Sequence, residues 1–442
     1  MTKRIACFTA YKAPADDTVG INSGCAPEVI ELISQLAEGS WEIDLYCVQE
    51  NLFELQVTQD KTGIRLIQIP ANIETGISPA GKSADNVIET IQKFIAANRV
   101  GYDLVYTAQL SSAAVAIALK DHLKIPLVFA WPDREHAARF TGRTDSGSIR
   151  KLEQQIVRRA DLVIVENQQT KAGLIEAHAA NPKKIFVVPG GINSQEFNPE
   201  NKIAARARLQ LEEKRQVLLH VAGQHEFVGV DNIIKALALL DDANRQISLV
   251  VIHDQSIPGS LEDDSQQSRL ESMAQDLGLA KQVDFVVWNE QLSMADYYAA
   301  ADILVATPGS KGEGMCTLQA MACGTPVIGS DAPSINLNVL DGKTGFLVPS
   351  KAAEVLADRI ALILRNEALL DQMRRNSVKH IRENFSWAQV ASQMEDLFEY
   401  VMLTKGKKTL PTPTKTRGSV NRHNPARGLS LKKNILARYG NS

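Results

Sequence analysis

Two patterns of apolar residues alternate along the chain. Short runs rich in β-branched residues, such as 4–10 (RIACFTA) and 42–48 (EIDLYCV), are typical of buried strands. Between these two runs, the apolar residues of 26–37 recur every three or four positions, which predicts an amphipathic helix. The alternation continues along the chain. Further strands are predicted at 63–70, 103–107, 126–131 and 162–166, and another begins at 185. Helices are predicted at 85–97, 113–123 and 150–161. Strands that alternate with helices of this length predict an α/β fold with parallel sheets and right-handed crossovers.

The same pattern resumes after residue 200 and predicts a second α/β region. Its predicted segments are 203–209, 216–222, 231–240, 247–253, 270–277, 283–288, 294–301, 303–307 and 326–329, followed by helices at 352–364, 367–383 and 388–403. We expect Ser386 to cap the last helix. A chain of 442 residues is long enough for two domains, each with its own core.

The segment 303–329 is expected to carry a ligand site. Its first strand ends at Pro308 and leads into a glycine-rich loop at 309–314, and then into a helix that Gly324 ends. In a doubly wound sheet, a ligand lies beyond the carboxyl ends of the strands, against a helix N-terminus. The glycine-rich loop is therefore a predicted binding element.

Four motifs resemble those of one known family. Residues 320–327 (AMACGTPV), 341–349 (DGKTGFLVP), 185–199 (IFVVPGGINSQEFNP) and 385–387 (FSW) resemble segments of the retaining GT-B glycosyltransferases of the family 4 group. The resemblance covers roughly residues 4–403. It implies two Rossmann-like, doubly wound parallel-sheet domains that face each other across a cleft. It also implies a retaining, metal-independent reaction without a cofactor, in which a nucleotide sugar is the co-substrate.

The resemblance implies domain boundaries as well. An N-terminal, acceptor-side domain is expected at 1–190, and a C-terminal nucleotide-sugar domain at 191–387. A helix at 388–404 is expected to cross back onto the N-terminal domain. Residues 405–442 are rich in Pro, Ser, Thr and Gly, which predicts a largely disordered tail.

The family's two donor-site glutamates are altered in this chain. Glu313 corresponds to the first of these glutamates only if the loop before it differs in length from that of the family. In that case Glu313 is the predicted catalytic residue and contacts the sugar of the donor. The alternative is that Glu313 only contributes a favourable charge to the first turn of a helix. Gln319 replaces the second glutamate, and its amide can still hydrogen-bond a ribose hydroxyl. Gly314 is a further donor-binding candidate.

The predicted diphosphate site departs further from the family. The family pattern Gly-Arg-x-x-x-x-Lys-Gly corresponds to 222–229 (AGQHEFVG), where Gln224 stands for the arginine and Val228 for the lysine. His225 is the only nearby group that can become cationic, and an ordinary imidazole is mostly neutral near pH 7. We expect Gln224 and His225 to contact the donor diphosphate without the two cations that stabilise it in the family.

Two further candidates lie in the first domain. Gly20 and Gly24 belong to a loop that resembles the family's N-terminal glycine loop, which faces the donor phosphates and the acceptor. A plain turn between a strand and a helix is the alternative. His136 follows the strand at 126–131, where family members place a histidine near the reaction centre, although it lies a few residues late.

Charge is distributed unevenly along the chain. The formal net charge is −3, but residues 405–442 hold ten Lys or Arg and no acidic residue, so the rest of the chain is at about −13. The basic tail could contact an anionic membrane surface, an acidic partner or RNA, or only improve solubility. No RNP-like aromatic pattern favours nucleic acid.

The remaining composition indicates an ordinary globular protein. No apolar run approaches the roughly 20 residues that cross a bilayer, and residues 1–12 carry no cleavable signal. A cytoplasmic location is expected, with peripheral attachment to a membrane through the tail left open. The five cysteines form no CxxC pair and lie in apolar segments, which predicts reduced, buried thiols rather than a metal site.

Two functions remain open from the sequence. The first is a glycosyltransferase that moves a sugar from a nucleotide-sugar donor to a saccharide, lipid or small-molecule acceptor. The second is a catalytically weakened or inactive relative that serves as a binding or scaffold protein, since a fold alone does not imply a function.

Overall fold

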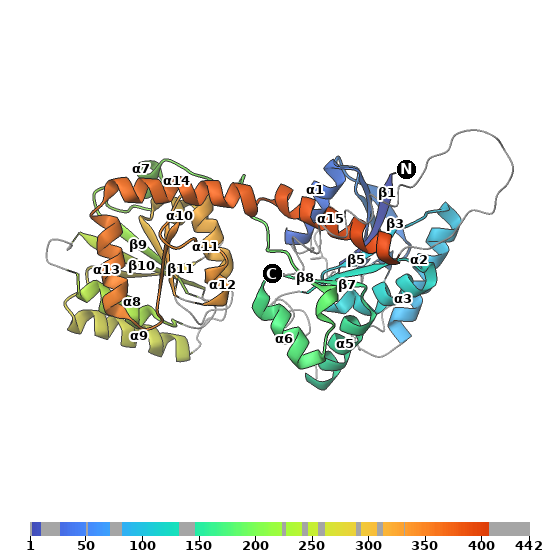
Figure 1. Ribbon diagram of the computed structural model, residues 1–442, viewed down its shortest axis with the longest axis horizontal. Helices are drawn as coiled ribbons and strands as arrows, with labels where there is room; N and C mark the ends of the chain where they lie inside the picture. The colour runs from blue at the N-terminus through green and yellow to red at the C-terminus, as the bar shows by residue number, and fades with distance from the viewer. Residues whose placement is uncertain are drawn as a thin grey trace. The chain divides into compact units, whose positions relative to one another are not determined.

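The computed structural model of the chain describes residues 2–9, 27–49, 52–70, 82–131, 146–222, 227–240, 246–254, 261–288, 293–306, 313–330 and 332–405. They form two compact units, each shown in Figure 1. The N-terminal unit comprises the chain up to Pro189 and the segment that begins at Trp387. The C-terminal unit extends from Gly190 to Ser386.

The N-terminal unit is built on an eight-stranded sheet in the order β3-β4-β2-β1-β5-β6-β7-β8. Its strands are β1 (Lys3–Thr9), β2 (Trp41–Gln49), β3 (Gln56–Gln59), β4 (Arg65–Pro70), β5 (Leu104–Thr107), β6 (Leu127–Ala130), β7 (Leu162–Val165) and β8 (Ile185–Val187). The predicted parallel pairing is confirmed from β4 to β8. Only β3 pairs antiparallel, at the edge of the sheet. The sequence pattern missed β3 because all four of its residues are exposed and it has no buried face.

Helices cover both faces of this sheet. They are α1 (Pro27–Glu38), α2 (Lys82–Asn98), α3 (Ala113–Leu123), α5 (Ser146–Arg159), α6 (Gln168–His178) and α15 (Trp387–Lys405), with short 3₁₀ turns at Leu110–Ser112 and Pro182–Lys184. The apolar faces of α1 and α15 pack on one side, while α2, α3, α5 and α6 pack on the other. Phe398 of α15 lies edge-on to Trp41 at 5.8 Å between ring centroids and 5.7 Å from Tyr106. These aromatic contacts hold the last helix on the N-terminal sheet. Lys405, which the sequence pattern assigned to the tail, is the final residue of α15, and 406–442 lie outside the described residues.

The C-terminal unit is built on a six-stranded parallel sheet in the order β11-β10-β9-β12-β13-β14. Its strands are β9 (Gln216–Val221), β10 (Ile247–Asp254), β11 (Val283–Trp288), β12 (Ile303–Ala306), β13 (Val327–Ser330) and β14 (Gly345–Val348). With β9 counted as the first strand, this is the order 3-2-1-4-5-6 of dinucleotide-binding sheets. The predicted doubly wound arrangement is confirmed.

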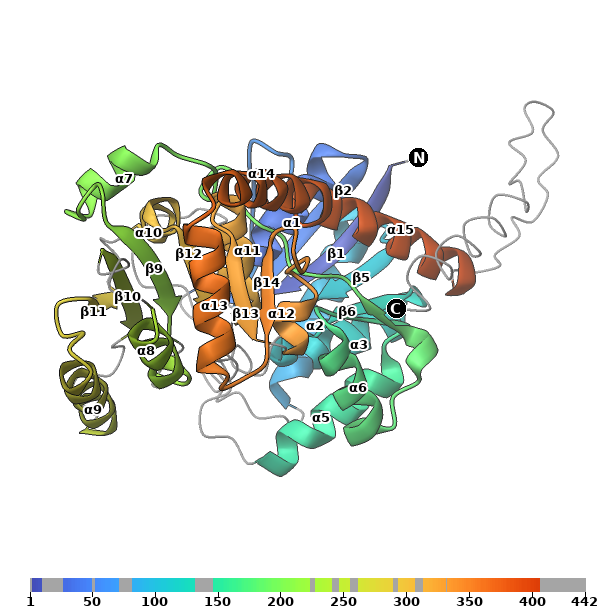
Figure 2. The same ribbon diagram turned by 60° about the vertical axis from the view of Figure 1, so that its left-hand side comes forward.

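The helices of the C-terminal unit form two layers, which can be followed in Figure 2. They are α7 (Lys202–Arg208), α8 (Val230–Ala238), α9 (Leu261–Asp276), α10 (Met294–Ala300), α11 (Glu313–Ala322), α12 (Pro333–Asn336), α13 (Ala353–Leu364) and α14 (Glu367–Asn384). One layer contains α8, α9 and α13, and the other contains α10, α11 and α12; α14 packs against both, through Leu370 and Met373 on the first and Ile381 on the second. Leu218 and Leu219 of β9 are fully buried and pack against opposite layers. Because both faces of this central strand are buried, its sequence is a nearly continuous apolar run.

Several element boundaries differ from the predictions. Helix α9 begins at Leu261 rather than at 270, because its first turns (LEDDSQQS) carry almost no apolar face. Helix α12 and strand β14 span four residues each, which is too short for a periodicity to show. Cys7, Cys47, Cys316 and Cys323 are buried thiols as expected, while Cys25 lies outside the described residues. Among the described helices, none is both long and apolar enough to cross a bilayer.

Candidate functional site

The order of the C-terminal strands reverses between β9 and β12, and the position at their carboxyl ends is called the β9–β12 crevice below. The chain proceeds from β9 through β10 to β11 on one side, and then returns to the other side of β9 to form β12, β13 and β14. The parallel strands β9 and β12 therefore end at the same edge of the sheet, where the strand order reverses. A crevice of this kind, at the carboxyl ends of the strands, is where open α/β sheets bind their ligands.

A buried histidine joins the two strands at this crevice. Strands β9 and β12 pair through only two residues each, Leu218 and Leu219 with Ile303 and Leu304. One step further, Nδ1 of His220 lies 2.9 Å from the carbonyl oxygen of Val305. A carbonyl oxygen only accepts, so Nδ1 carries the proton and donates. Burial lowers the pKa of His220, which keeps the imidazole neutral near pH 7.

Replacing His220 with leucine is expected to reduce the free energy of unfolding by about 1–3 kcal/mol at pH 7.5, because the buried Val305 carbonyl loses its donor. The difference should shrink in acid. Native His220 has a lowered pKa, whereas unfolded His220 binds a proton at its ordinary pKa near 6.5, so the wild type loses stability as the pH falls below about 6.5. The free energy of unfolding of the wild type falls by at most about 1.4 kcal/mol per pH unit through this effect. Urea unfolding at pH 7.5, 6.5 and 5.5 measures it.

The control for this series is His122→Leu, since His122 is exposed on α3. At pH 7.5 this variant should unfold with nearly the wild-type free energy, because an exposed side chain contributes little to stability. A constant difference between the wild type and His220→Leu across this range would contradict a neutral, buried His220.

The first turn of α11 is held by an asparagine from a distant segment. The Gly314 carbonyl accepts hydrogen bonds from Oγ1 of Thr317 at 2.7 Å and from Nδ2 of Asn338 at 2.8 Å. Nδ2 of Asn338 also donates to Oγ1 of Thr317 at 2.9 Å, and Asn338 is only 6% exposed. Nε2 of His380 in turn donates to the Asn338 carbonyl at 3.1 Å. The start of α11 is therefore anchored to α14 through Asn338.

Two predicted site residues lie at this helix start. Glu313 is the first residue of α11, at the carboxyl end of β12, and Gly314 is the second. The described part of Glu313 is its backbone. The role of Glu313 as catalytic residue and that of Gly314 as donor ligand remain predictions.

Gln319 makes a contact that the sequence did not indicate. Its Oε1 accepts a hydrogen bond from the hydroxyl of Tyr298 on α10 at 3.0 Å. Tyr298 is 1% exposed, and burial raises the pKa of its hydroxyl, which stays protonated as the donor. Gln319 thus joins α10 to α11, and its predicted contact with a ribose remains a prediction.

Five predicted residues lie outside the described residues: Gly20, Gly24, His136, Gln224 and His225. The described strands that precede these residues in the chain show which strand each of the five follows. Residues 223–226 follow Ala222, whose N–H donates to the Ile252 carbonyl at 2.8 Å at the carboxyl end of β9. Gly229 then begins α8 with φ at 81°, a backbone conformation that favours glycine. This backbone requirement explains the last glycine of the 222–229 motif.

The N-terminal sheet has its own crevice, between β1 and β5. Residues 10–26 follow β1, and residues 132–145 follow β6. At the carboxyl end of β5, Oγ1 of Thr107 donates to the Phe8 carbonyl at 3.1 Å and lies 2.8 Å from Oγ of Ser112. The neighbouring Thr9 is 3% exposed, and its hydroxyl has no hydrogen-bond partner among the described residues. Hydroxyl groups therefore line the edge from which the Gly20–Gly24 loop departs.

The sequence missed His220, Asn338, Tyr298 and Thr9. A histidine within the apolar run of β9 was a visible signal for a buried role. Asn338 and Tyr298 carried no such signal, because their partners lie 24 and 21 residues away along the chain. Within the described ranges, no group of three or more His, Cys, Asp or Glu side chains could hold a metal ion, and metal independence remains a prediction.

Comparison with known proteins matches both units. Residues 24–196 match the model of Glycosyltransferase Family 4, and residues 201–380 match that of the Glycosyl transferases group 1. The D-inositol 3-phosphate glycosyltransferase of Corynebacterium glutamicum is 26% identical over 407 residues, which cover 89% of this chain and 96% of that protein. Its counterpart from Corynebacterium aurimucosum is 28% identical over 411 residues, with 90% and 96% covered.

Solved structures give the same fold. Sucrose-phosphate synthase from Thermosynechococcus elongatus is 26% identical, has a TM-score of 0.59, and covers 91% of this chain and 100% of its own. Anabaena HepE in complex with UDP and glucose is 18% identical with a TM-score of 0.61, covering 90% and 100%. The chain therefore belongs to the family 4 (group 1) glycosyltransferases of the GT-B fold.

Proposed function

We propose that this chain transfers a hexose from a nucleoside-diphosphate sugar to a small hydroxylated acceptor, with retention of anomeric configuration and without a metal ion. A phosphorylated polyol of the inositol phosphate type is the first acceptor candidate. The observation that carries the proposal is the crevice between β9 and β12, with the first turn of α11 at its edge. Similarity to D-inositol 3-phosphate glycosyltransferases supports the acceptor, and the fold shared with UDP-bound HepE supports the donor.

The start of α11 suits the diphosphate of such a donor. A helix N-terminus presents unpaired N–H groups and a partial positive charge, and this stabilises anions without a metal. Asn338 fixes that first turn through the Gly314 carbonyl, so its N–H groups are held in place before a ligand arrives. This preorganised charge is the contribution expected in place of the Arg and Lys that Gln224 and Val228 replace.

The proposed roles of the remaining candidates follow from their segments. Gln224 and His225, in the loop after β9, contact the diphosphate from the other side of the crevice. Gln319 reaches the ribose with its amide nitrogen while Tyr298 holds its oxygen. Gly20, Gly24 and His136 contribute on the acceptor side. An inactive scaffold is not favoured, because relatives matched over nine-tenths of the chain are themselves named as transferases.

Purified full-length protein, incubated with UDP-, GDP- and ADP-hexoses and with D-inositol 3-phosphate or hexose phosphates, is expected to release the nucleotide only when the acceptor is present. EDTA should leave the rate unchanged, and NMR should show an α-linked product from an α-linked donor. Nucleotide release and product mass measure the reaction. Loss of activity in EDTA would overturn the metal-independent reaction, an inverted product would overturn retention, and the absence of release with every pair would overturn the transferase assignment.

A further inference from the structure

A basic cavity opens at the opposite edge of the C-terminal sheet from the β9–β12 crevice. It has a volume of about 600 Å³ and is lined by α14, by residues 199–202 before and at the start of α7, and by the loop from α11 to β13. Ala301 and Thr325, which line it, precede β12 and β13, so the cavity lies at the amino ends of these strands. A volume of this size suits a small molecule rather than a polymer.

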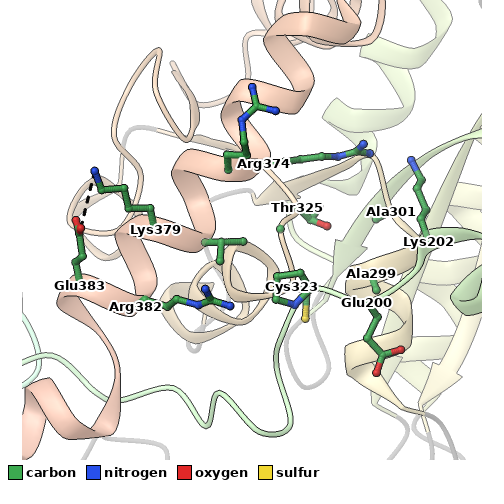
Figure 3. A pocket seen from close by; sticks show the side chains of 14 residues that line it. Glu200, Lys202, Ala299, Ala301, Cys323, Thr325, Arg374, Lys379, Arg382 and Glu383 are labelled. Carbon is green, nitrogen blue, oxygen red and sulfur yellow. Dashed lines mark ion pairs between the residues drawn. The ribbon is translucent and has the colours of Figure 1, made fainter.

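The lining is strongly cationic. Five basic side chains face two acidic ones, Glu200 and Glu383. The basic residues are Lys202, Arg374, Arg375, Lys379 and Arg382 (Figure 3). Arg375, Lys379 and Arg382 follow one another at helical spacing on the same face of α14, where like charges repel. The sequence alone gave no sign of this cavity, because a stretch of basic residues on a helix is usually a solvated face.

Two of the five cations have no acidic partner in the described part of the chain, whereas Lys202, Arg374 and Lys379 each pair with a carboxylate. Glu383 lies 3.9 Å from Lys379, the pair that Figure 3 marks, and Glu200 is paired with Arg208 outside the cavity at 2.5 Å. Arg375 and Arg382 form no ion pair with any part of the described chain. Two guanidinium groups in the cavity wall are thus left available to an anion.

A buried carboxylate next to the cavity holds two of the lining cations in place. Asp302 is 5% exposed and accepts hydrogen bonds from the Val217 N–H and from Nη2 of Arg206, both at 2.8 Å. It also pairs with Lys202, and Nη2 of Arg374 lies 3.4 Å from it. One negative charge therefore positions three cations.

Lys202 and Arg374 keep donors for a further ligand. An ammonium has three N–H donors and a guanidinium five, and Asp302 takes few of them. Burial lowers the pKa of Lys202 to about 8, with Asp302 opposing the shift and Arg374 and Arg206 adding to it. An anion in the cavity would offset both the lost hydration and the repulsion between these cations.

We propose that this cavity is a binding site for a small phosphorylated molecule, which Arg375, Arg382, Lys202 and Arg374 hold by its phosphate. Guanidinium forks match phosphate oxygens in pairs, and several fixed cations within one small cavity favour a multiply charged phosphate over a carboxylate. The apolar parts of the lining, such as Val378 and Ala299, are available to the rest of the molecule.

The site is separate from the candidate donor crevice but is linked to it by two elements. Cys323 and Gly324, in the cavity wall, follow the end of α11, whose first residues lie at the crevice. Helix α14 contributes Arg375 and Arg382 to the cavity and His380 to the Asn338 network. A ligand in the cavity would therefore contact α14 and the residues that directly follow α11.

Calorimetric titration of the full-length protein with inorganic phosphate and with glucose 6-phosphate, at constant ionic strength, tests the proposal. The wild type should bind at least one of the two probes saturably. The double variant Arg375→Gln/Arg382→Gln should bind it at least tenfold more weakly, with an unchanged melting temperature in the absence of ligand. The matched control Lys281→Gln/Lys343→Gln removes two exposed cations outside the cavity and should bind like the wild type.

The variant Val378→Phe fills the cavity without changing its charge, and it should also lose binding. If the double arginine variant fails to fold, Val378→Phe still tests whether the phosphate binds in the cavity. The absence of saturable binding to the wild type, equal affinity in the wild type and both cavity variants, or an equal loss in the lysine control would each overturn the proposal. An equal loss in the lysine control would indicate diffuse charge attraction.

Discussion

Sugar transfer by the Glu313→Gln variant is expected to fall by about 10²–10³ in kcat, the loss that follows when one preorganised electrostatic contact at a reacting centre is removed. Glu313 begins α11, the helix that follows β12, and β12 is the neighbour of β9 in the sheet. An amide keeps the size of the side chain but removes its charge. Because a first-turn acid adds only about 0.3–1 kcal/mol to a helix, the fold should tolerate the change. Steady-state rates at saturating donor measure the effect.

Glu367→Gln is the matched control, because Glu367 is the first residue of α14 and also provides an acidic charge in a first turn. It should retain the wild-type rate, and both variants should melt within a few degrees of the wild type. If Glu313→Gln and Glu367→Gln were equally active, Glu313 would be no more than a favourable helix charge, and the catalytic assignment would fall.

Gly345→Ala is expected to destabilise the C-terminal unit by more than about 4 kcal/mol, beyond the range of ordinary substitutions. Gly345 pairs with Val327 where β14 joins β13. A Cβ at this position would lie 1.7 Å from the Val327 carbonyl oxygen and 2.7 Å from its carbonyl carbon. Both atoms belong to the backbone of a sheet, so neither can move aside without breaking the pairing. Urea unfolding followed by circular dichroism should show the loss of one of two transitions.

Gly342→Ala, three residues earlier, separates a steric clash from backbone strain. Gly342 has φ at 70°, but a Cβ there would meet no atom within 4 Å. This variant should lose only about 1–3 kcal/mol, the usual cost of a strained backbone conformation. If both variants were equally stable, the close packing of β14 against β13 would be wrong.

The periodicity of apolar residues predicted most of the helices and strands, and the reason is physical. A segment that buries one face must repeat apolar residues at the period of its own geometry. Helix α3 is confirmed at 113–123 and strand β11 at 283–288. Strand β3 was missed because its four residues are exposed, and the start of α9 was missed because its sequence, LEDDSQQS, has only one apolar residue.

The candidate site was predictable only in part. The glycine loop could be singled out from the strand, loop and helix pattern, and Glu313 and the 222–229 segment from their resemblance to the family's donor-site motifs. The strand order, which brings the ends of β9 and β12 to one crevice, depends on how the sheet is wound. The same holds for the hydrogen bond of His220 to Val305 and for that of Asn338 to Gly314. Each joins residues that no local pattern connects.

The sequence by itself determined the two α/β regions and most of their helices and strands, because a buried face requires apolar residues at the period of the helix or strand. Its motifs also indicated the family. Only the tertiary structure decided which strand ends meet, which polar groups hold α11 in place, and that cations from α7 and α14 surround one cavity beside the buried Asp302. The physical reason is that electrostatic and hydrogen-bonding contacts act through space, between residues whose separation along the chain carries no information about their distance.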